Sequence, residues 1–225
     1  MTESLSKLRD PNENWLQRWE KGDIGWHHVE FNQHLLNHWH TLFLPEGSLV
    51  LAPLCGKSRD MYWLAEQGYR IRGVELSQLA IKMFFKEHQL QPTIERVGEF
   101  ECWRQGPYEL LCGDIFDLYQ FDNSDIEAVY DRASLVALNP QQRKQFAQML
   151  IETLPKGVKI LLVTMDYPQH EMDGPPYSVG EAEVRALFES RYSVTMLHDL
   201  NLLHDTDRYS GRGVSQMSEQ IYLLK

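Results

Sequence analysis

The stretch from residue 49 to residue 75 most constrains what this chain can fold into. It opens with the apolar run Leu49–Ala52, which is typical of a strand buried on both faces. A turn around Gly56 and a helix over residues 58–67 are expected next, followed by a second apolar strand that ends in Glu75. This order of strand, glycine turn, helix, strand and acid is the unit of a nucleotide-binding α/β fold.

Gly56 and Glu75 indicate which nucleotide this unit holds. A glycine lets the backbone pass close to a ligand at the carboxyl end of the first strand. Glu75 follows Gly56 by 19 residues, so its carboxylate is expected at the tip of the next strand, where ribose hydroxyls can donate to it. The turn lacks the further glycines of G-x-G-x-x-G that a pyrophosphate needs. S-adenosylmethionine, which has a ribose and no phosphate, fits better than a dinucleotide; the alternative is an ordinary βαβ unit whose glycine only makes a turn.

Composition excludes several classes of partner. Of the 225 residues, 43% are hydrophobic and 24% charged, which is ordinary for a soluble α/β domain. The net charge of −10, without a basic strip, argues against a long nucleic-acid substrate. Cys55, Cys102 and Cys112 form no C-x-x-C pair, which favours free thiols in a reducing compartment. Because residues 1–14 lack a secretion signal and no apolar run could span a bilayer, we expect a cytoplasmic protein without a membrane partner. A monomer is expected as well.

The rest of the chain continues the alternation of strands and helices. Further helices are expected over residues 78–88, 140–154 and 181–189, and further strands over 94–97, 100–103, 108–112, 126–130, 158–165, 192–197 and 220–224. The loop over residues 166–180 is rich in proline and glycine and follows the most apolar strand, so it is a candidate for the substrate site. No internal repeat or linker is visible, and residues 1–225 are expected to form a single domain.

Two aromatic helices are expected ahead of the nucleotide unit. Trp15 and Trp19 share one helical face, and Leu35 and Trp39 share another. Such rings can simply pack in the core. They can also cover a ligand, because aromatic rings interact favourably with a cationic sulfonium. We interpret residues 14–45 as an N-terminal helical lid, with core packing as the alternative.

Asp114 and the histidines indicate a function less specifically than Gly56 and Glu75 do. Asp114 follows the strand 108–112, where it either holds the adenine amino group or only caps the next turn. Nine histidines include His34 and His38, four residues apart, but they come without H-E-x-x-H or a cysteine partner. No metal site is predicted.

A set of short motifs, in a fixed order from residue 15 to residue 225, resembles one known family. The motifs are W-x-x-x-W at 15–19, PLCGK at 53–57, GVE at 73–75, IFDL at 115–118, DRASLVALNP at 131–140, GPPY at 174–177 and YLL at 222–224. Together they resemble the thiopurine S-methyltransferase family, whose members are class I methyltransferases that use S-adenosyl-L-methionine. Such a set is far more specific than a single glycine motif.

The resemblance implies roles for individual residues. In addition to Gly56, the implied cofactor contacts are Trp15, Trp19, Leu54, Glu75, Asp114, Ile115 and Arg132. The implied substrate contacts are Trp26, Arg132, Pro175, Pro176 and a C-terminal arginine, Arg208 or Arg212. Two positions depart from the animal enzymes, since Trp26 stands where they usually carry Phe and Asp114 where they tend to carry Ser. These departures bear on the shape of the acceptor pocket and on the adenine contact.

The expected fold is a class I methyltransferase α/β fold, with a seven-stranded, mainly parallel sheet, helices on both faces and an antiparallel last strand. The expected reaction moves the methyl group of S-adenosyl-L-methionine to an aromatic or heterocyclic thiol such as a thiopurine, with selenium and tellurium compounds as further acceptors that the resemblance suggests. Transfer to an amine is the alternative, because Gly174–Tyr177 superficially resembles the Asn/Asp-Pro-Pro-Tyr box of amine methyltransferases. A NAD-dependent oxidoreductase and a cofactor-binding regulator are weaker alternatives.

Arg132 is the predicted catalytic residue. A guanidinium stays charged at any working pH, and here it would keep an acidic thiol ionised and aligned. The alternative is a structural salt bridge with Asp131 or another nearby acid. No covalent enzyme intermediate is needed, so the cysteines are expected to be bystanders.

Overall fold

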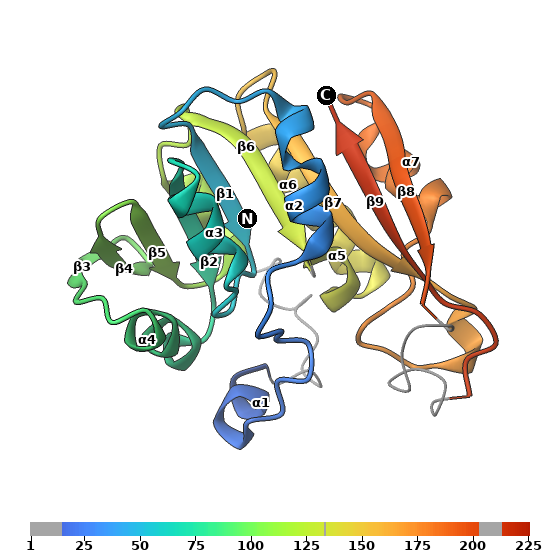
Figure 1. The fold of residues 1–225 in the computed structure, drawn as a ribbon, viewed down its shortest axis with the longest axis horizontal. Coiled ribbons are helices and arrows are strands. Elements are labelled where there is room, and N and C mark those ends of the chain that lie inside the picture. The colour runs from blue at the N-terminus through green and yellow to red at the C-terminus, as the bar shows by residue number, and fades with distance from the viewer. Residues whose placement is uncertain (1–14, 133, 203–212) are drawn as a thin grey trace, which may run out of the picture.

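The computed structural model describes residues 15–132, 134–202 and 213–225, which form one sheet with helices on both faces (Figure 1). The strands are β1 (Leu49–Pro53), β2 (Arg70–Glu75), β3 (Thr93–Val97), β4 (Phe100–Gln105), β5 (Tyr108–Cys112), β6 (Ile126–Arg132), β7 (Lys159–Asp166), β8 (Val194–Asn201) and β9 (Ser218–Leu224). The α-helices are α1 (Trp15–Lys21), α2 (Gln33–His38), α3 (Asp60–Glu66), α4 (Gln78–Glu87), α5 (Ser134–Ala137), α6 (Pro140–Thr153) and α7 (Glu181–Phe188). Short 3-10 helices are η2 (Trp39–Leu42), η3 (Ile115–Gln120) and η4 (Gln169–Glu171).

The strand order within the described residues is β3-β4-β5-β2-β1-β6-β7-β9-β8. The five strands from β5 to β7 run parallel, and β9 is antiparallel to both β7 and β8, as predicted for the last strand. The sheet has nine strands rather than the seven predicted, because β3 and β4 pair antiparallel with each other and β4 pairs with β5. A two-stranded hairpin has two open edges, and pairing with β5 satisfies the backbone groups of the edge on β4.

The predicted strand–turn–helix–strand unit is confirmed. β1 and β2 are parallel neighbours joined by α3. The helix starts at Asp60, two residues later than predicted, because Ser58 still belongs to the turn: its N–H donates to Cys55 O over 3.0 Å. The turn therefore ends next to the first residue of α3, and this position brings the Asp60 side chain close to the strand ends.

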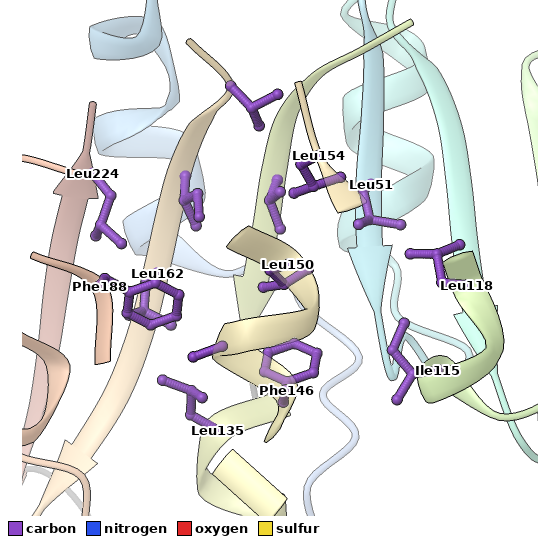
Figure 2. Packing of buried hydrophobic residues seen from close by; sticks show 14 of the residues in the cluster. Leu51, Ile115, Leu118, Leu135, Phe146, Leu150, Leu154, Leu162, Phe188 and Leu224 are labelled. Carbon is purple, nitrogen blue, oxygen red and sulfur yellow. The ribbon is translucent and has the colours of Figure 1, made fainter. Parts of the chain in front are cut away.

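Successive side chains of each strand point to opposite faces of the sheet, and they form two apolar cores, one on each face. Leu51 packs on the α6 and α7 face, and its neighbour Val50 on the face covered by α2, α3 and α4. Figure 2 shows Phe146 and Leu150 of α6 among the buried residues of the first core. Each fully buried side chain of this size stabilises the fold by about 1.5–3 kcal/mol relative to its exposed form.

The longest helix, α6, begins where the sequence predicts. Asn139 is its N-cap and accepts from the N–H groups of Gln141 and Gln142, each over 3.0 Å, while Gln142 Oε1 accepts from Asn139 N–H over 3.1 Å. Pro140 occupies the first turn, where a missing N–H costs nothing. This reciprocal cap sets the entry to the helix from sequence information alone.

The second N-terminal helix belongs to the core. Leu35 and Trp39 are buried, and the Trp39 ring packs edge-on against Tyr130 with ring centres 6.1 Å apart. Figure 1 shows α2 lying across the sheet beside β6 and β7. Of the two interpretations of the N-terminal aromatic residues, packing therefore describes α2.

Among the described residues, no helix combines the length and apolar character needed to cross a membrane.

Candidate cofactor and acceptor site

Four residues singled out from the sequence lie where the parallel strands end. Gly56 follows β1, Glu75 ends β2, Asp114 follows β5 and Arg132 ends β6. Because β5, β2, β1 and β6 are neighbours in that order, the four positions share one edge of the sheet. Helix α1 lies toward the same end of the molecule (Figure 1). Ligands of open α/β sheets bind beyond the carboxyl ends of the strands, so this edge is the candidate site.

The Glu75 carboxylate is fixed by the backbone of the glycine turn. The Gly56 N–H donates to Glu75 Oε2 over 2.8 Å, and the Ser77 N–H donates to Oε1 over 2.7 Å. Burial raises the pKa of Glu75, and hydrogen bonds from the backbone of Ser77, Gly56 and Leu76 oppose that rise. Each carboxylate oxygen has a second lone pair, so both have the capacity to accept a hydroxyl as well. A pair of ribose hydroxyls suits this arrangement.

The turn around Gly56 lets another group approach its backbone closely, and in this structure that group is the Trp19 ring. Gly56 has a φ of 53°, and Leu54 has a φ of 46°, which is uncommon for a residue with a side chain. A methyl group at Gly56 would lie 3.1 Å from the Trp19 ring. Leu76 is apolar yet 43% exposed, directly after Glu75. Sequence reasoning missed Leu76, and its signal was an apolar residue immediately following the ribose acid.

Asp114 caps the turn that follows β5, which was one of its two predicted roles. Its Oδ1 accepts from the Phe116 N–H over 2.9 Å, and Gly113 N–H donates to Glu75 O over 3.0 Å, which places this turn beside the end of β2. Ile115 is buried in the core on the α6 face, as Figure 2 shows. The cofactor contact of Ile115 stays a prediction, and burial of the side chain leaves the backbone for that role.

Three tryptophans of the N-terminal segment pack together beside the glycine turn. The Trp26 ring lies edge-on to Trp15 and Trp19, with centres 5.2 and 6.0 Å apart. The Arg18 guanidinium lies over Trp26 at 4.4 Å. Trp19 is buried, and its ring lies over Gly56. The segment is thus seated on the turn by aromatic contacts, although α1 contributes only two turns of helix.

Arg132 faces an acid that sequence reasoning missed. Its Nη1 lies 3.6 Å from Asp60 Oδ2, and the Asp60 carboxylate is buried at the start of α3. Asp131 turns to the other face of the sheet, where its Oδ1 accepts from the Ser134 N–H over 3.1 Å. Of the partners left open for Arg132, the structure therefore selects the nearby acid rather than Asp131. An acid just after the glycine turn was the available signal.

Further cationic side chains lie near Arg132. Burial lowers the pKa of His27, and the charges of Lys57 and Arg132 lower it further, with Glu87 opposing. Lys57 is buried, and its Nζ pairs with Glu87 Oε1 at 2.5 Å. A lowered pKa leaves His27 mostly neutral at neutral pH, so the fixed cations of this region are the lysine and the arginine. Each of these two cations has an acid nearby, Glu87 beside Lys57 and Asp60 beside Arg132.

The loop 166–180 is held against the segment that follows Arg132. The Tyr167 hydroxyl donates to Pro176 O over 2.6 Å, and the Tyr177 N–H donates to Val136 O over 2.7 Å. These bonds bring Pro175 and Pro176 to the region after β6. The predicted substrate contact Arg208 and its alternative Arg212 lie outside the described residues.

The cysteines are unsuited to nucleophilic work. All three are free thiols. Burial raises the pKa of Cys55 well above its usual range, and it raises the pKa of Cys102 and of Cys112 to about 11. A thiol nucleophile reacts as the thiolate, so these groups stay inert near neutral pH.

His34 and His38 make structural contacts. His34 Nε2 lies 2.7 Å from Glu219 Oε2, and the rings of His34 and His38 stack at 6.4 Å. Within the described residues, no three histidine, cysteine or acidic side chains are arranged to hold a metal ion.

Comparison with known proteins identifies the family. The family model described as thiopurine S-methyltransferase matches residues 10–225. The chain is 46% identical over 213 residues to the thiopurine S-methyltransferase of Nitrosospira multiformis, covering 94% of this chain and 96% of that protein. It is 46% identical over 210 residues to the protein of the same name from Pseudomonas entomophila, covering 93% and 97%.

A solved structure supports the fold. The S-adenosylmethionine-dependent methyltransferase from Anabaena variabilis superposes with a TM-score of 0.64 at 14% identity, covering 94% of this chain and 93% of that one. The strand order, the acid at the end of β2 and the extended sequence match agree with one another. The chain belongs to the thiopurine S-methyltransferase family.

Proposed function

We propose that this protein transfers the methyl group of S-adenosyl-L-methionine to the sulfur of an aromatic or heterocyclic thiol, such as a thiopurine. The observation that carries the proposal is the placement of the Glu75 carboxylate and the Arg132 guanidinium at one edge of the sheet, in a chain of this family. The first suits a ribose, and the second suits an anionic acceptor. Relatives of 46% identity carry the name of this activity.

The residues at this edge fit the cofactor. Glu75 would accept from the ribose hydroxyls, while Gly56 and Leu54 shape the turn against which the ligand lies. Asp114 and the backbone of Ile115 would meet the adenine, with the exposed side chain of Leu76 as an apolar surface. Trp15 and Trp19 would cover it from α1. When bound, the cofactor supplies a methyl group on a sulfonium, which a thiolate displaces.

The chain's own residues would bind and align the acceptor thiol and stabilise its negative charge. Arg132 would keep the acceptor ionised, since its guanidinium carries a charge that does not titrate in the working range. An aromatic thiol is acidic enough that no strong base is required, and the buried cysteine thiols supply no competing nucleophile. Trp26, Pro175 and Pro176 would form walls of the acceptor site, and the role of Arg208 stays a prediction.

The lid is proposed for residues 15–26 rather than for the whole of 14–45. The later part of that segment, α2, packs its apolar side chains in the core. The earlier part is held on the Gly56 turn by Trp19 and by the aromatic cluster. A segment attached by one surface can open for ligand entry and, once closed, keep water from the transferring methyl group.

Transfer to an amine is less well supported. Amine methyltransferases grip the acceptor with a polar side chain at the first position of their box, and here that position is Gly174. The Gly174–Tyr177 segment also follows β7, whereas β6 ends in Asp131 and Arg132. The site therefore offers a cation where an amine acceptor needs a hydrogen-bond acceptor.

The proposal is tested by a methyl-transfer assay with a panel of acceptors. The panel holds aromatic thiols, aliphatic thiols, aromatic amines, and selenium and tellurium oxyanions, each with S-adenosyl-L-methionine. Aromatic thiols should be methylated most efficiently. Methylation confined to amines, or binding of NADH in place of S-adenosylhomocysteine, would replace this proposal by one of its alternatives.

The monomeric state, the cytoplasmic location and the exclusion of nucleic-acid partners stay predictions from the sequence. Free thiols at Cys55, Cys102 and Cys112 support a reducing compartment. Sedimentation of the purified protein would measure the oligomeric state.

A further inference from the structure

Asp60 is a buried acid to which the proposed mechanism gives no role. It is 2% exposed, at the first position of α3. Burying an ionised carboxylate is costly unless other groups compensate its charge and fill its hydrogen-bonding sites. Its compensating partners come from β6 and from the residue that precedes α2, and both regions border the candidate site.

One carboxylate oxygen faces Arg132. The Tyr130 hydroxyl donates to Asp60 Oδ2 over 2.9 Å, and Arg132 Nη1 lies 3.6 Å from the same oxygen. Tyr130 and Arg132 are two residues apart on β6, so their side chains leave the same face of the sheet. A charge-assisted hydrogen bond would be about 2.7–2.9 Å long. At 3.6 Å the acid orients the guanidinium by charge and leaves its N–H groups for another acceptor.

The other carboxylate oxygen holds the end of the N-terminal segment. The Asn32 N–H donates to Asp60 Oδ1 over 2.8 Å, and Asn32 is the N-cap of α2. The neighbouring Arg59 reinforces this contact, because its Nη1 donates to Val29 O over 2.5 Å and its guanidinium lies 5.2 Å from the Phe31 ring. The start of α3 therefore anchors residues 29–32, a few residues after Trp26.

We propose that Asp60 is a positioning residue for methyl transfer. It sets the orientation of Arg132 at the acceptor end and ties that arginine to the base of the segment that carries Trp26. Acceptor recognition by Arg132 thus depends on a carboxylate that does not touch the acceptor. This inference rests on the proposed function, since it assigns Asp60 to the same acceptor site.

A purely structural role predicts a different pattern. If Asp60 only satisfied the Tyr130 hydroxyl and the Asn32 N–H, its loss would lower stability without acting through Arg132. A double-mutant cycle separates the two, because residues that act through each other give non-additive effects.

The experiment uses Asp60→Ala, Asp60→Asn, Arg132→Met and the double variant Asp60→Ala/Arg132→Met. Titration calorimetry measures the dissociation constant of an aromatic thiol in the dead-end complex with S-adenosylhomocysteine, and initial rates give the acceptor kcat and KM. Asp60→Ala should weaken acceptor binding about tenfold, and less than about twofold in the Arg132→Met background. Asp60→Asn should recover stability rather than acceptor binding, since its amide oxygen can accept from Tyr130 but carries no charge that could orient Arg132. Affinity for S-adenosylhomocysteine alone should change by a smaller factor than acceptor affinity, because Arg132 is only one of several implied cofactor contacts.

Glu109→Gln is a matched control. Glu109 Oε2 lies 2.6 Å from Arg72 Nε, and its Oε1 lies 2.7 Å from Arg104 Nε. This variant therefore also removes a carboxylate from a partly buried arginine pair, between β2 and β5. It should lower the melting temperature and leave acceptor binding unchanged. If Asp60→Ala weakens acceptor binding by the same factor in both backgrounds, Asp60 is structural and the inference is wrong.

Tyr130→Phe covers the case in which the Asp60 variants do not fold. It removes the hydroxyl that holds Oδ2 and leaves the charge, so acceptor binding should weaken by about threefold in the wild type and remain unchanged in Arg132→Met. Equal effects in both backgrounds would again overturn the inference. A wild type that neither binds nor methylates thiols would refute the proposed function and this inference with it, whereas an active wild type with an additive cycle refutes the inference alone.

Discussion

The backbone N–H of Gly56 donates to Glu75 Oε2 over 2.8 Å, across the ends of two parallel strands. The glycine thus does two things, because it makes the turn and it fixes the carboxylate of the next strand. The Ser77 N–H holds the other oxygen over 2.7 Å. A carboxylate held at both oxygens is preorganised for a ligand with two neighbouring hydroxyls.

Replacement of Glu75 by Ala should weaken binding of S-adenosyl-L-methionine by about 1.5–3 kcal/mol, as expected for the loss of a charged hydrogen-bond acceptor. Titration calorimetry measures the change, with Glu109→Gln as the control acid away from the site. A folded Glu75→Ala protein with wild-type affinity would remove Glu75 from the cofactor site.

Replacement of Gly56 by Ala should lower both stability and cofactor affinity. The new methyl group would meet the Trp19 ring at 3.1 Å, and the φ of 53° is unfavourable for alanine by about 1 kcal/mol. Gly106→Ala is the matched control, because Gly106 has a φ of 55° and open space around it. Thermal melts and titration should show that both variants lose stability and that only Gly56→Ala loses affinity. Equal affinity in the two variants would contradict the close approach at Gly56.

Residues 15–26 should become more protected from hydrogen exchange when S-adenosylhomocysteine binds. The segment is seated on the Gly56 turn through Trp19, and a ligand beneath it adds contacts that hold it closed. Mass spectrometry follows the exchange, with α2 as an internal reference that is already buried. Identical exchange of 15–26 in free and bound protein would return these tryptophans to a packing role.

Replacement of Arg132 by Met should raise the acceptor KM most for acidic thiols near neutral pH. Removing the cation disfavours the bound thiolate, so the acceptor's pKa in the site rises and the pH–rate profile moves to higher pH. Arg132→Lys keeps the charge, so its acceptor KM and its pH–rate profile should lie between those of the wild type and of Arg132→Met. Initial rates from pH 5 to pH 10 measure the shift, and an unchanged profile would leave Arg132 structural.

Asp131 should make the protein less stable as pH rises. Burial raises the pKa of Asp131 from 3.8 to about 7 in the folded protein. The folded state therefore holds this proton more tightly than the unfolded state, so the free energy of unfolding falls between about pH 4 and pH 7 and stays low above that range. The total loss is roughly 4 kcal/mol at most.

Asp131→Asn isolates this effect, since its neutral amide can still accept from the Ser134 N–H. Urea unfolding at several pH values should show the variant gaining stability over the wild type through this window. A constant difference across pH would mean that Asp131 does not titrate there.

Local signals determined the order of the elements. Three of these signals lie within a short segment of sequence or between adjacent strands: the apolar run Leu49–Ala52, the cap at Asn139, and the spacing of Gly56 and Glu75. Backbone preferences and side-chain periodicity act over a few residues, so they can be read without tertiary contacts. The family motifs rest on the same residues, and they carried the prediction of fold, cofactor and reaction class.

Tertiary structure decided the rest. Pairing of Asp60 with Tyr130 joins residues 70 positions apart, and only the packing of α3 against β6 brings them together. The hairpin β3–β4 extends the sheet because β4 pairs with the open edge of β5. The Ile115 side chain lies in the core because the α6 and α7 face of the sheet is apolar. The sequence alone determined which chemistry this chain carries at its strand ends. Which acid faces Arg132, and which N-terminal helix is core, depended on contacts between distant segments. An acid after a turn or an apolar helix face does not by itself specify those contacts.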